Sequence, residues 1–370
     1  MLVGIPKEIK NNEYRTGLTP ESVQEFTAHG HEVIVQTQLG AGINALDADY
    51  EAAGAVVVST AEEIFERAEL IIKVKEPQPN ECEMLRRGQI LFTYLHLAPD
   101  DLQTELLLKS GVTAIAYETV TDQHGTLPLL APMSEVAGRL SVQAGAHCLE
   151  KSKGGLGVLL GGVTGVEPAD VVIIGGGVVG NNAAFVAHGM GARVTILDNS
   201  IPRLRQLDIQ YGGNVNCVFS NRAAIENYAK RADLLIGGVL VAGAEAPKLV
   251  TREMVREMKP GAVICDVAID QGGCVETSHA TTHSDPTYVV DEVVHYCVAN
   301  MPGAVPRTSS YALNHATLPY ALKLADKGWR QALRADRGFL PGLNVHEGKL
   351  TCEAVAEAQD LKFVAPETLL

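Results

Sequence analysis

The sequence predicts an α/β fold with two domains, each built around a mostly parallel sheet. Short apolar strand patterns alternate with helical patterns from the first residues onward, which is typical of parallel sheets covered by helices. The chain has 370 residues, whereas single cores stop growing near about 250–300 residues. A glycine-rich turn between two apolar strands, described below, is typical of a nucleotide-binding sheet.

The first domain is expected to cover residues 1–130 and to begin with a strand over Leu2–Ile5. Its first helix has a clear start, because Thr19 suits the N-cap and Pro20 the first helical position, and Gly30 suits its end. Strands and helices then alternate. Strands are predicted at Glu32–Gln36, Ala55–Val58, Leu70–Val74, Gln89–Leu95 and Val112–Tyr117, and helices near Tyr50 and at Glu62–Arg67, Glu81–Arg87 and Asp100–Lys109.

The second domain is expected to cover residues 131–305. Breaks at Thr126–Pro128 and Ala131–Pro132 predict that a long helix over Met133–Lys151 begins only after them, at Ser134. Beyond Pro306 a helix is predicted from Leu318 to Leu333, and residues 306–370 are expected to pack back on the first domain. The other elements predicted in the second domain are strands at Val171–Ile174, Arg193–Leu197, Asn216–Phe219, Leu234–Gly237, Val263–Val267 and Tyr288–Val290, and a helix at Asn181–Met190.

The most informative segment is the turn after the strand Val171–Ile174, where Gly175, Gly177 and Gly180 fit the spacing G-x-G-x-x-G. In dinucleotide-binding folds, the first glycine permits a tight turn, the second lets the backbone approach a pyrophosphate, and the third lets the helix pack closely on its strand. Asp198 ends the next predicted strand, where it can accept hydrogen bonds from an adenosine ribose and repel a 2′-phosphate. The sequence therefore predicts a Rossmann-like domain that binds NAD rather than NADP.

Composition excludes other classes of protein. A net charge of −14 without a Lys/Arg block argues against nucleic-acid binding. No uncharged run reaches the length of a membrane span, about 18–20 residues, and the N-terminus does not resemble a signal peptide. The seven cysteines are scattered without a C-x-x-C pair, which is typical of reduced thiols. We therefore expect a cytoplasmic protein with no membrane partner.

Ligands of open α/β sheets bind outside the carboxyl ends of the strands. Polar residues expected there are Arg15, Lys73, Lys75, His96, Asp266 and Asp270, of which Asp266 should still belong to its strand. A dehydrogenase acting on an amino acid needs such a set: cations hold the substrate carboxylate, and an imidazole or carboxylate moves the proton. Each has a simpler interpretation as well. His96 could be a core histidine, Lys75 a solvated surface lysine and Arg15 a loop charge.

Longer motifs across both domains resemble the alanine dehydrogenase/nicotinamide nucleotide transhydrogenase family, and within it the bacterial L-alanine dehydrogenases. The resemblance covers nearly the whole chain. It implies two Rossmann-like domains with the active site in the cleft between them, and the reversible conversion of L-alanine, NAD⁺ and water to pyruvate, ammonium and NADH. The motifs that carry it are Gly4–Glu8, Glu13–Pro20, Lys73–Pro77, Tyr94–Ala98, Pro132–Arg139, Asp266–Gly273 and Tyr296–Gly303.

The resemblance also implies roles for individual residues. Arg15 and Lys75 would bind the carboxylate and carbonyl of the substrate, and His96 and Asp270 would act as acid and base. The family's cofactor contacts fall on Ser134, Asp198, Arg203, Ser220, Val239, Leu240, Val267, Ala268, Ile269, Asp270, Val298, Ala299, Asn300 and Met301. A homohexamer is implied as well.

Two departures from relatives concern the cofactor and a metal. Many relatives have an arginine near the cofactor's phosphates where this chain has His279, so NAD affinity is expected to differ. Some relatives have a histidine where this chain has Lys327. In those relatives the histidine, together with the residue matching Glu118, is proposed to hold a divalent cation. Lysine is no ligand at neutral pH, so we expect no metal site there, nor at His279 and His283.

Three other functions stay open on the residues alone. A lysine- or saccharopine-type dehydrogenase would not keep the whole set of Arg15, Lys75 and His96. A hydride-carrying transhydrogenase-type module would bind NAD(H) without an organic substrate of its own. A catalytically inactive NAD sensor would tolerate the loss of His96 and Asp270.

Overall fold

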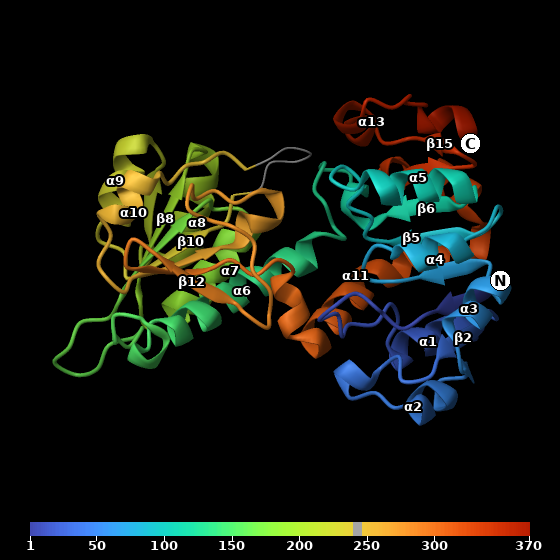
Figure 1. Cartoon of the computed structure of the whole chain (residues 1–370), viewed down its shortest axis with the longest axis horizontal. Helices are drawn as coiled ribbons and strands as arrows, with labels where there is room; N and C mark the ends of the chain where they lie inside the picture. The colour runs from blue at the N-terminus through green and yellow to red at the C-terminus, as the bar shows by residue number, and fades with distance from the viewer. Residues whose placement is uncertain (240–245) are drawn as a thin grey trace. The chain divides into compact units, whose positions relative to one another are not determined.

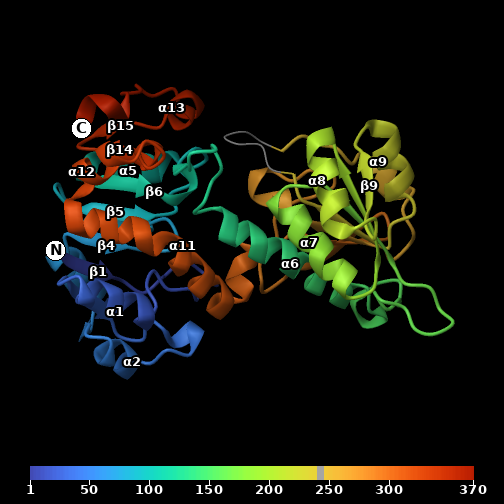
Figure 2. The same cartoon turned by 180° about the vertical axis from the view of Figure 1, so that it is seen from behind.

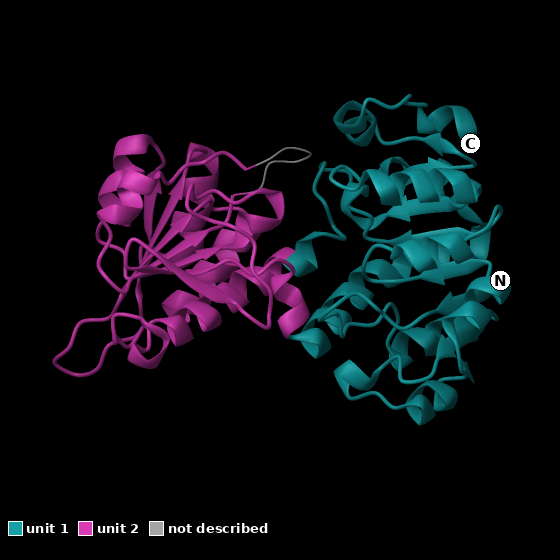
Figure 3. Ribbon diagram, viewed as in Figure 1, with its two compact units in different colours: residues 1–133, 305–370 teal, residues 134–304 magenta. Residues whose placement is uncertain are grey.

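The computed structural model describes residues 1–239 and 246–370, which form two compact units (Figure 1, Figure 3). Unit 1 comprises residues 1–133 and 305–370, and unit 2 comprises residues 134–304. Unit 1 is thus built from both ends of the chain. No helix in the described ranges is long and apolar enough to cross a membrane.

Unit 1 contains an eight-stranded sheet in the order β15-β14-β6-β5-β4-β1-β2-β3. The strands from β6 to β3 pair in parallel, whereas β14 pairs antiparallel with both β6 and β15. The C-terminal segment therefore extends the sheet begun by the N-terminus. The strands are β1 (Leu2–Ile5), β2 (Glu32–Gln36), β3 (Val56–Val58), β4 (Leu70–Ile72), β5 (Ile90–Thr93), β6 (Thr113–Ala116), β14 (Leu343–His346) and β15 (Lys349–Leu350).

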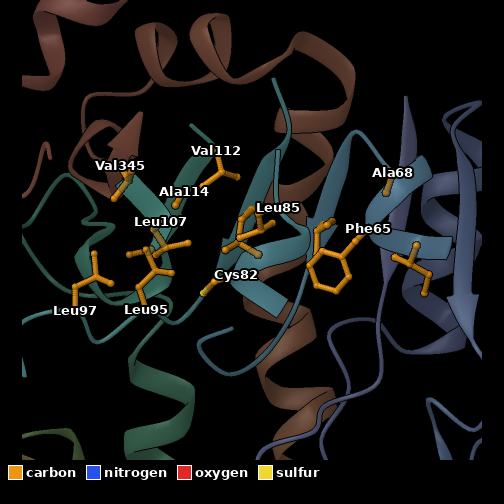
Figure 4. Packing of buried hydrophobic residues seen from close by; sticks show 14 of the residues in the cluster. Phe65, Ala68, Cys82, Leu85, Leu95, Leu97, Leu107, Val112, Ala114 and Val345 are labelled. Atoms are coloured by element: carbon orange, nitrogen blue, oxygen red, sulfur yellow. The ribbon is translucent and has the colours of Figure 1, made fainter. Parts of the chain in front are cut away.

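Helices cover both faces of this sheet. α3, α4 and α5 lie on one face, and α1 and α11 lie on the other (Figure 1, Figure 2). Under α3, α4 and α5, aliphatic and aromatic side chains form a continuous core with residues of β5, β6 and β14 (Figure 4). The helices are α1 (Pro20–Ala28), α2 (Asp47–Ala52), α3 (Ala61–Arg67), α4 (Pro79–Met84), α5 (Asp101–Ser110), α11 (Pro306–Lys327), α12 (Trp329–Ala335) and α13 (Glu353–Gln359), with 3₁₀ turns η1 (Ala41–Ile43), η2 (Tyr117–Thr119), η6 (Leu340–Gly342) and η7 (Pro366–Leu369).

Unit 2 contains a seven-stranded sheet in the order β12-β13-β11-β10-β7-β8-β9. All its pairs are parallel except the edge pair of β12 and β13. The order reverses between β7 and β10, as in doubly wound nucleotide-binding sheets. The strands are β7 (Asp170–Ile174), β8 (Arg193–Asp198), β9 (Asn216–Phe219), β10 (Leu234–Gly237), β11 (Val263–Asp266), β12 (Thr287–Val290) and β13 (Val293–Tyr296).

The helices of unit 2 also lie on both faces of its sheet. α9 and α10 pack against the face formed by Val172 and Ile174, and α6, α7 and α8 lie on the opposite face (Figure 2). The helices are α6 (Ala131–Cys148), which begins at the end of unit 1, α7 (Val178–Gly189), α8 (Ile201–Tyr211), α9 (Arg222–Ala229) and α10 (Arg252–Arg256), with 3₁₀ turns η3 (Lys151–Lys153), η4 (Val267–Gln271) and η5 (Met301–Ala304).

The predicted fold class is confirmed, and so are most of the predicted elements. Thr19 caps α1 by accepting a hydrogen bond from the Ser22 amide at 3.4 Å, and Pro20 is its first residue. Asp266 ends β11, as expected. The strands β13, β14 and β15 have no counterpart among the predicted elements.

Several predicted helix boundaries are wrong. The long helix starts at Ala131 rather than Ser134 and ends at Cys148 rather than Lys151. The C-terminal helix starts at Pro306 rather than Leu318 and continues through Pro319 to Lys327. The reason for both starts is the same: a proline in the first turn lacks only an N–H that no helical carbonyl would accept, so it starts a helix instead of ending one.

Candidate active site

The first sheet brings three of the predicted site residues to one edge. Arg15, Lys75 and His96 lie in the segments that follow β1, β4 and β5, which are neighbours in this parallel sheet. The Thr93 hydroxyl at the end of β5 donates to the Lys75 carbonyl at 3.0 Å, and Gly17 lies against the last carbonyl of β4, at Ile72. We call this the carboxyl edge of unit 1.

Arg15 is buried, with only 3% of its surface exposed. Its Nε and Nη2 donate to the two carboxylate oxygens of Glu13 at 2.7 and 2.6 Å. Burial by itself lowers the pKa of Arg15, but Glu13 outweighs it and raises that pKa, so the guanidinium is charged. The loop is further held by α11, because Ser310 accepts from the Thr16 amide and Asn314 from the Thr19 amide.

The two lysines after β4 have different surroundings. Lys73 is fully buried, and its Nζ donates to Glu8 at 2.9 Å and to Glu81 at 2.8 Å. Burial lowers the pKa of Lys73, but the two carboxylates raise it well above its usual range, so Lys73 is a buried structural cation. Lys75 has a side chain that is 14% exposed, with Nζ 3.7 Å from Glu76. Of the two, only Lys75 is placed to meet a ligand.

His96 is not a core histidine, because 43% of its side chain is exposed. Its backbone adopts φ +50°, in the left-handed region that non-glycine residues rarely occupy. Its imidazole stacks on Tyr94, with ring centroids 5.6 Å apart and planes 8° apart. Burial raises the pKa of Tyr94, and its hydroxyl donates to the Leu129 carbonyl at 2.5 Å, so this phenol is a neutral, fixed platform for the imidazole.

Charges converge beside these residues on Glu76. Burial raises the pKa of Glu76, but Lys75, Lys10 and His96 together lower it below its ordinary value. Lys10 also donates directly to its carboxylate. Lys75 and His96 follow the paired strands β4 and β5, so both lie at this edge together with Glu76.

The glycine motif of unit 2 has the predicted geometry. Gly175 has φ +95°, and a Cβ on Gly180 would lie 1.8 Å from the Gly175 carbonyl oxygen. A Cβ on Gly177 would meet nothing within 4 Å, so the protein itself does not require a glycine there. Gly177 is the N-cap of α7. The helix begins at Val178 rather than at the predicted Asn181, so the third glycine, Gly180, lies within its first turn.

Asp198 ends β8 and closes this loop. Its Oδ2 accepts from the Gly176 amide at 2.7 Å and its Oδ1 from the Ser200 amide at 2.8 Å. Arg203 donates from Nε to the Gly176 carbonyl at 2.6 Å. Both predicted cofactor residues therefore hold Gly176, which lies between the first two glycines of the motif. Their sequence positions did not indicate this role.

The other predicted cofactor residues mostly follow strand ends of the same sheet. Ser220 follows β9 and donates its amide to the Asp198 carbonyl at 2.9 Å, and Val239 lies against Gly175. Ser134 lies in the first turns of α6. Leu240 lies outside the described residues. The remaining positions are in η4 after β11 (Val267, Ala268, Ile269, Asp270) and after β13 (Val298, Ala299, Asn300, Met301).

These last two segments are joined by a hydrogen bond. The Asn300 amide donates to Asp270 Oδ1 at 3.4 Å, and Asn300, like His96, has a positive φ, at +66°. Both segments leave the carboxyl ends of neighbouring strands, since β11 pairs with β13. The second sheet thus brings its predicted cofactor residues to one edge, the carboxyl edge of unit 2.

His279 and His283 lie in the segment between η4 and β12, and Lys327 is the last residue of α11. The His279 ring stacks on Tyr288, with centroids 3.7 Å apart. His283 Nε2 donates to the Asn300 carbonyl oxygen at 3.1 Å. Across the described ranges, no group of three or more His, Cys, Asp or Glu side chains could hold a metal ion.

Sequence reasoning assigned no role to the carboxylates that hold the predicted residues in place. Glu13 could have been found, because it lies two residues before Arg15. Glu118 accepts from the Leu95 and His96 amides at 3.1 and 2.6 Å, and Glu8 accepts from the Val74 and Lys75 amides at 2.7 and 3.3 Å. These partners are far apart in sequence, and only the pairing of neighbouring strands brings them together.

Comparison with known proteins gives a consistent family. The family model described as the N-terminal domain of alanine dehydrogenase/PNT matches residues 4–137, and its C-terminal counterpart matches residues 141–353. The chain is 60% identical to the alanine dehydrogenase of Halomonas elongata over 370 residues, which is 100% of both chains. It is 55% identical to that of Mycobacterium tuberculosis and 56% identical to that of Methanococcus maripaludis, again over 100% of both chains.

Solved structures agree. An L-alanine dehydrogenase matches with a TM-score of 0.94 at 53% identity, over 97% of this chain and 99% of the other. A transhydrogenase from Sinorhizobium meliloti shares the fold, with a TM-score of 0.82 at 24% identity over 96% of this chain and 100% of the other. Family models, full-length relatives and structures all lead to one assignment. The chain therefore belongs to the alanine dehydrogenase/PNT family.

Proposed function

We propose that this chain catalyses the NAD-dependent, reversible oxidative deamination of L-alanine to pyruvate and ammonium. The observation that carries the proposal is identity of 52–60% to curated alanine dehydrogenases over 98–100% of the chain. The two carboxyl edges support it further, because they supply the cations, the imidazole and the nucleotide loop that this reaction requires.

The glycine loop of unit 2 fits NAD. The open space at Gly177 leaves room for a pyrophosphate, and the N-terminus of α7 offers it free amides and a positive dipole end. Asp198 ends β8, where a carboxylate can accept from ribose hydroxyls and disfavours a 2′-phosphate. When bound, NAD⁺ accepts the hydride that leaves the α-carbon of the substrate.

The residues of the chain bind the substrate and move its protons. Arg15 and Lys75 hold the substrate carboxylate and, as the product forms, the developing carbonyl oxygen. His96 and Asp270 serve as acid and base: loss of hydride leaves an imine of pyruvate, they direct water to its carbon, and the adduct releases ammonia. In this proposal the predicted substrate domain, residues 1–130 and 306–370, supplies the substrate residues. Residues 131–305 supply the cofactor contacts, among them Ser134, Arg203, Ser220 and Asn300.

Two further properties belong to the proposal. The family resemblance supports a homo-oligomer, a hexamer, and the net charge of −14 supports the absence of a nucleic-acid partner. All seven cysteines are free, which fits a reducing compartment, and we propose the cytoplasm. Size-exclusion chromatography with light scattering measures the first property, and fractionation of the source cells measures the second.

The test is the change in NADH absorbance with purified protein, forward with L-alanine and NAD⁺ and in reverse with pyruvate, ammonium and NADH. Turnover should be confined to L-alanine and NAD, with D-alanine, lysine and NADP as controls. Clear NADH binding without any turnover of alanine would overturn the proposal and favour a transhydrogenase-type module or a sensor. Turnover of lysine in place of alanine would favour a lysine- or saccharopine-type enzyme.

A further inference from the structure

The peptide between Leu95 and His96 is held from both sides by side chains of other elements. Glu118, in η2, accepts from the His96 amide at 2.6 Å and from the Leu95 amide at 3.1 Å. Gln103, in α5, donates to the Leu95 carbonyl at 3.0 Å. These bonds hold His96 at φ +50°, a conformation that an L-residue leaves unless its surroundings fix it.

The contact of Glu118 is with the main chain rather than with the imidazole. Its carboxylate is 4.0 Å from His96 Nδ1, which is beyond hydrogen-bonding distance. The direction of the ring is set instead by its stacking on Tyr94, which packs edge-on against Tyr117, the residue before Glu118. The main-chain conformation of residue 96 and the ring platform therefore both depend on η2.

We propose that Glu118 is a positioning residue for the reaction: its carboxylate holds the His96 main chain in the left-handed conformation from which the imidazole reaches the substrate. This inference rests on the proposed function, because it gives His96 the acid/base role. In this role the position of the acceptor oxygens of Glu118 matters, and its charge does not.

Conservative variants separate these two properties. Glu118→Gln keeps an acceptor oxygen in place and removes the charge. Glu118→Asp keeps the charge but withdraws the acceptors, and Glu118→Ala removes them. We expect kcat for L-alanine to fall by about 10- to 100-fold in Glu118→Ala, to fall less in Glu118→Asp, and to stay near wild type in Glu118→Gln.

The KM values separate positioning from general damage. Arg15 and Lys75 are held by Glu13 and Glu8, not by Glu118. The KM for L-alanine and the affinity for NADH should therefore change far less than kcat. Hydrogen exchange of the peptide spanning residues 94–98 should become faster in Glu118→Ala, a readout that does not depend on activity.

The chain offers a matched control for the loss of such a contact. Gln38 also has a left-handed conformation, at φ +61°, and Asp47 accepts from its amide at 2.7 Å. The Asp47→Ala variant thus removes the same kind of support from a segment that follows β2, away from His96. It should lower the melting temperature and leave kcat unchanged.

The outcomes are distinguishable from failure of the proposed function. A wild-type protein without alanine turnover overturns the function and this inference together. If the wild type is active and Glu118→Ala keeps its kcat, the positioning role alone is overturned. The same holds if Glu118→Ala loses no more kcat than Asp47→Ala does. Equal losses in Glu118→Gln and Glu118→Ala would show that the charge matters and would also overturn it.

Discussion

Substitution of Gly177 by alanine should weaken NADH binding without destabilising the protein. A Cβ at this position meets nothing within 4 Å in the protein, and the φ of −67° is one that any residue adopts. The space that the methyl group would fill is therefore the space proposed for the pyrophosphate. Overpacking costs about 1–3 kcal/mol, which is about a 5- to 140-fold loss of affinity at 1.4 kcal/mol per factor of ten.

Two other glycines of α7 calibrate this prediction. Gly180→Ala places a Cβ 1.8 Å from the Gly175 oxygen, so it should destabilise the fold itself. Gly189→Ala meets nothing within 4 Å and replaces glycine at the end of a helix, so it should be neutral or stabilise by up to about 1 kcal/mol.

The assay measures NADH affinity by fluorescence titration and stability by urea unfolding for all three variants. The expected pattern is loss of affinity alone for Gly177→Ala, loss of stability for Gly180→Ala, and neither for Gly189→Ala. Unchanged NADH affinity in Gly177→Ala would refute the reasoning that a ligand, rather than the protein, requires this glycine. A fall in its stability equal to that of Gly180→Ala would refute it equally.

Three further variants test unit 1. His96→Ala should lower kcat by about 10²–10⁴-fold while sparing NADH affinity; equal loss of both would make His96 a structural residue. Lys73→Met leaves Glu8 and Glu81 buried without their cation, so urea unfolding should show a loss of about 3–5 kcal/mol, and no loss would contradict the buried ion pair. The folded-state pKa of Glu76 is lowered below the ordinary 4.5, so its contribution to stability is present above that pH and is lost as the pH falls through the lower, folded value. Urea unfolding from pH 7 downward should therefore show a shallower acid-side decline for Glu76→Gln than for wild type, and identical declines would contradict this assignment.

The sequence predicted the nucleotide loop well because its determinants are local. Gly175, Gly177, Gly180 and Asp198 lie within one strand–helix–strand unit, where spacing alone constrains the geometry. Helix starts were predicted less well, because a proline such as Pro306 can begin a helix or mark a break, and packing against the sheet decides between them.

The surroundings of the predicted catalytic histidine could not be predicted in the same way. No sequence pattern indicates that Glu118 contacts the His96 amide, because the two residues are 22 positions apart. Their contact depends on the parallel pairing of β5 with β6, which places the segments after both strands together. Strain at His96 is likewise a property of the tertiary structure, since nothing in the sequence marks a left-handed residue other than glycine.

The divided construction of unit 1 has a consequence for how the protein is made. A ribosome completes residues 134–304 before it synthesises β14 and α11, so unit 2 has its whole chain while the first sheet still lacks its antiparallel edge. The loop that carries Arg15 lacks Ser310 and Asn314 until the same late stage. A chain terminated before residue 305 would therefore hold a complete nucleotide fold but an incomplete substrate loop, so synthesis of residues 305–370 is required before the substrate residues are held in place.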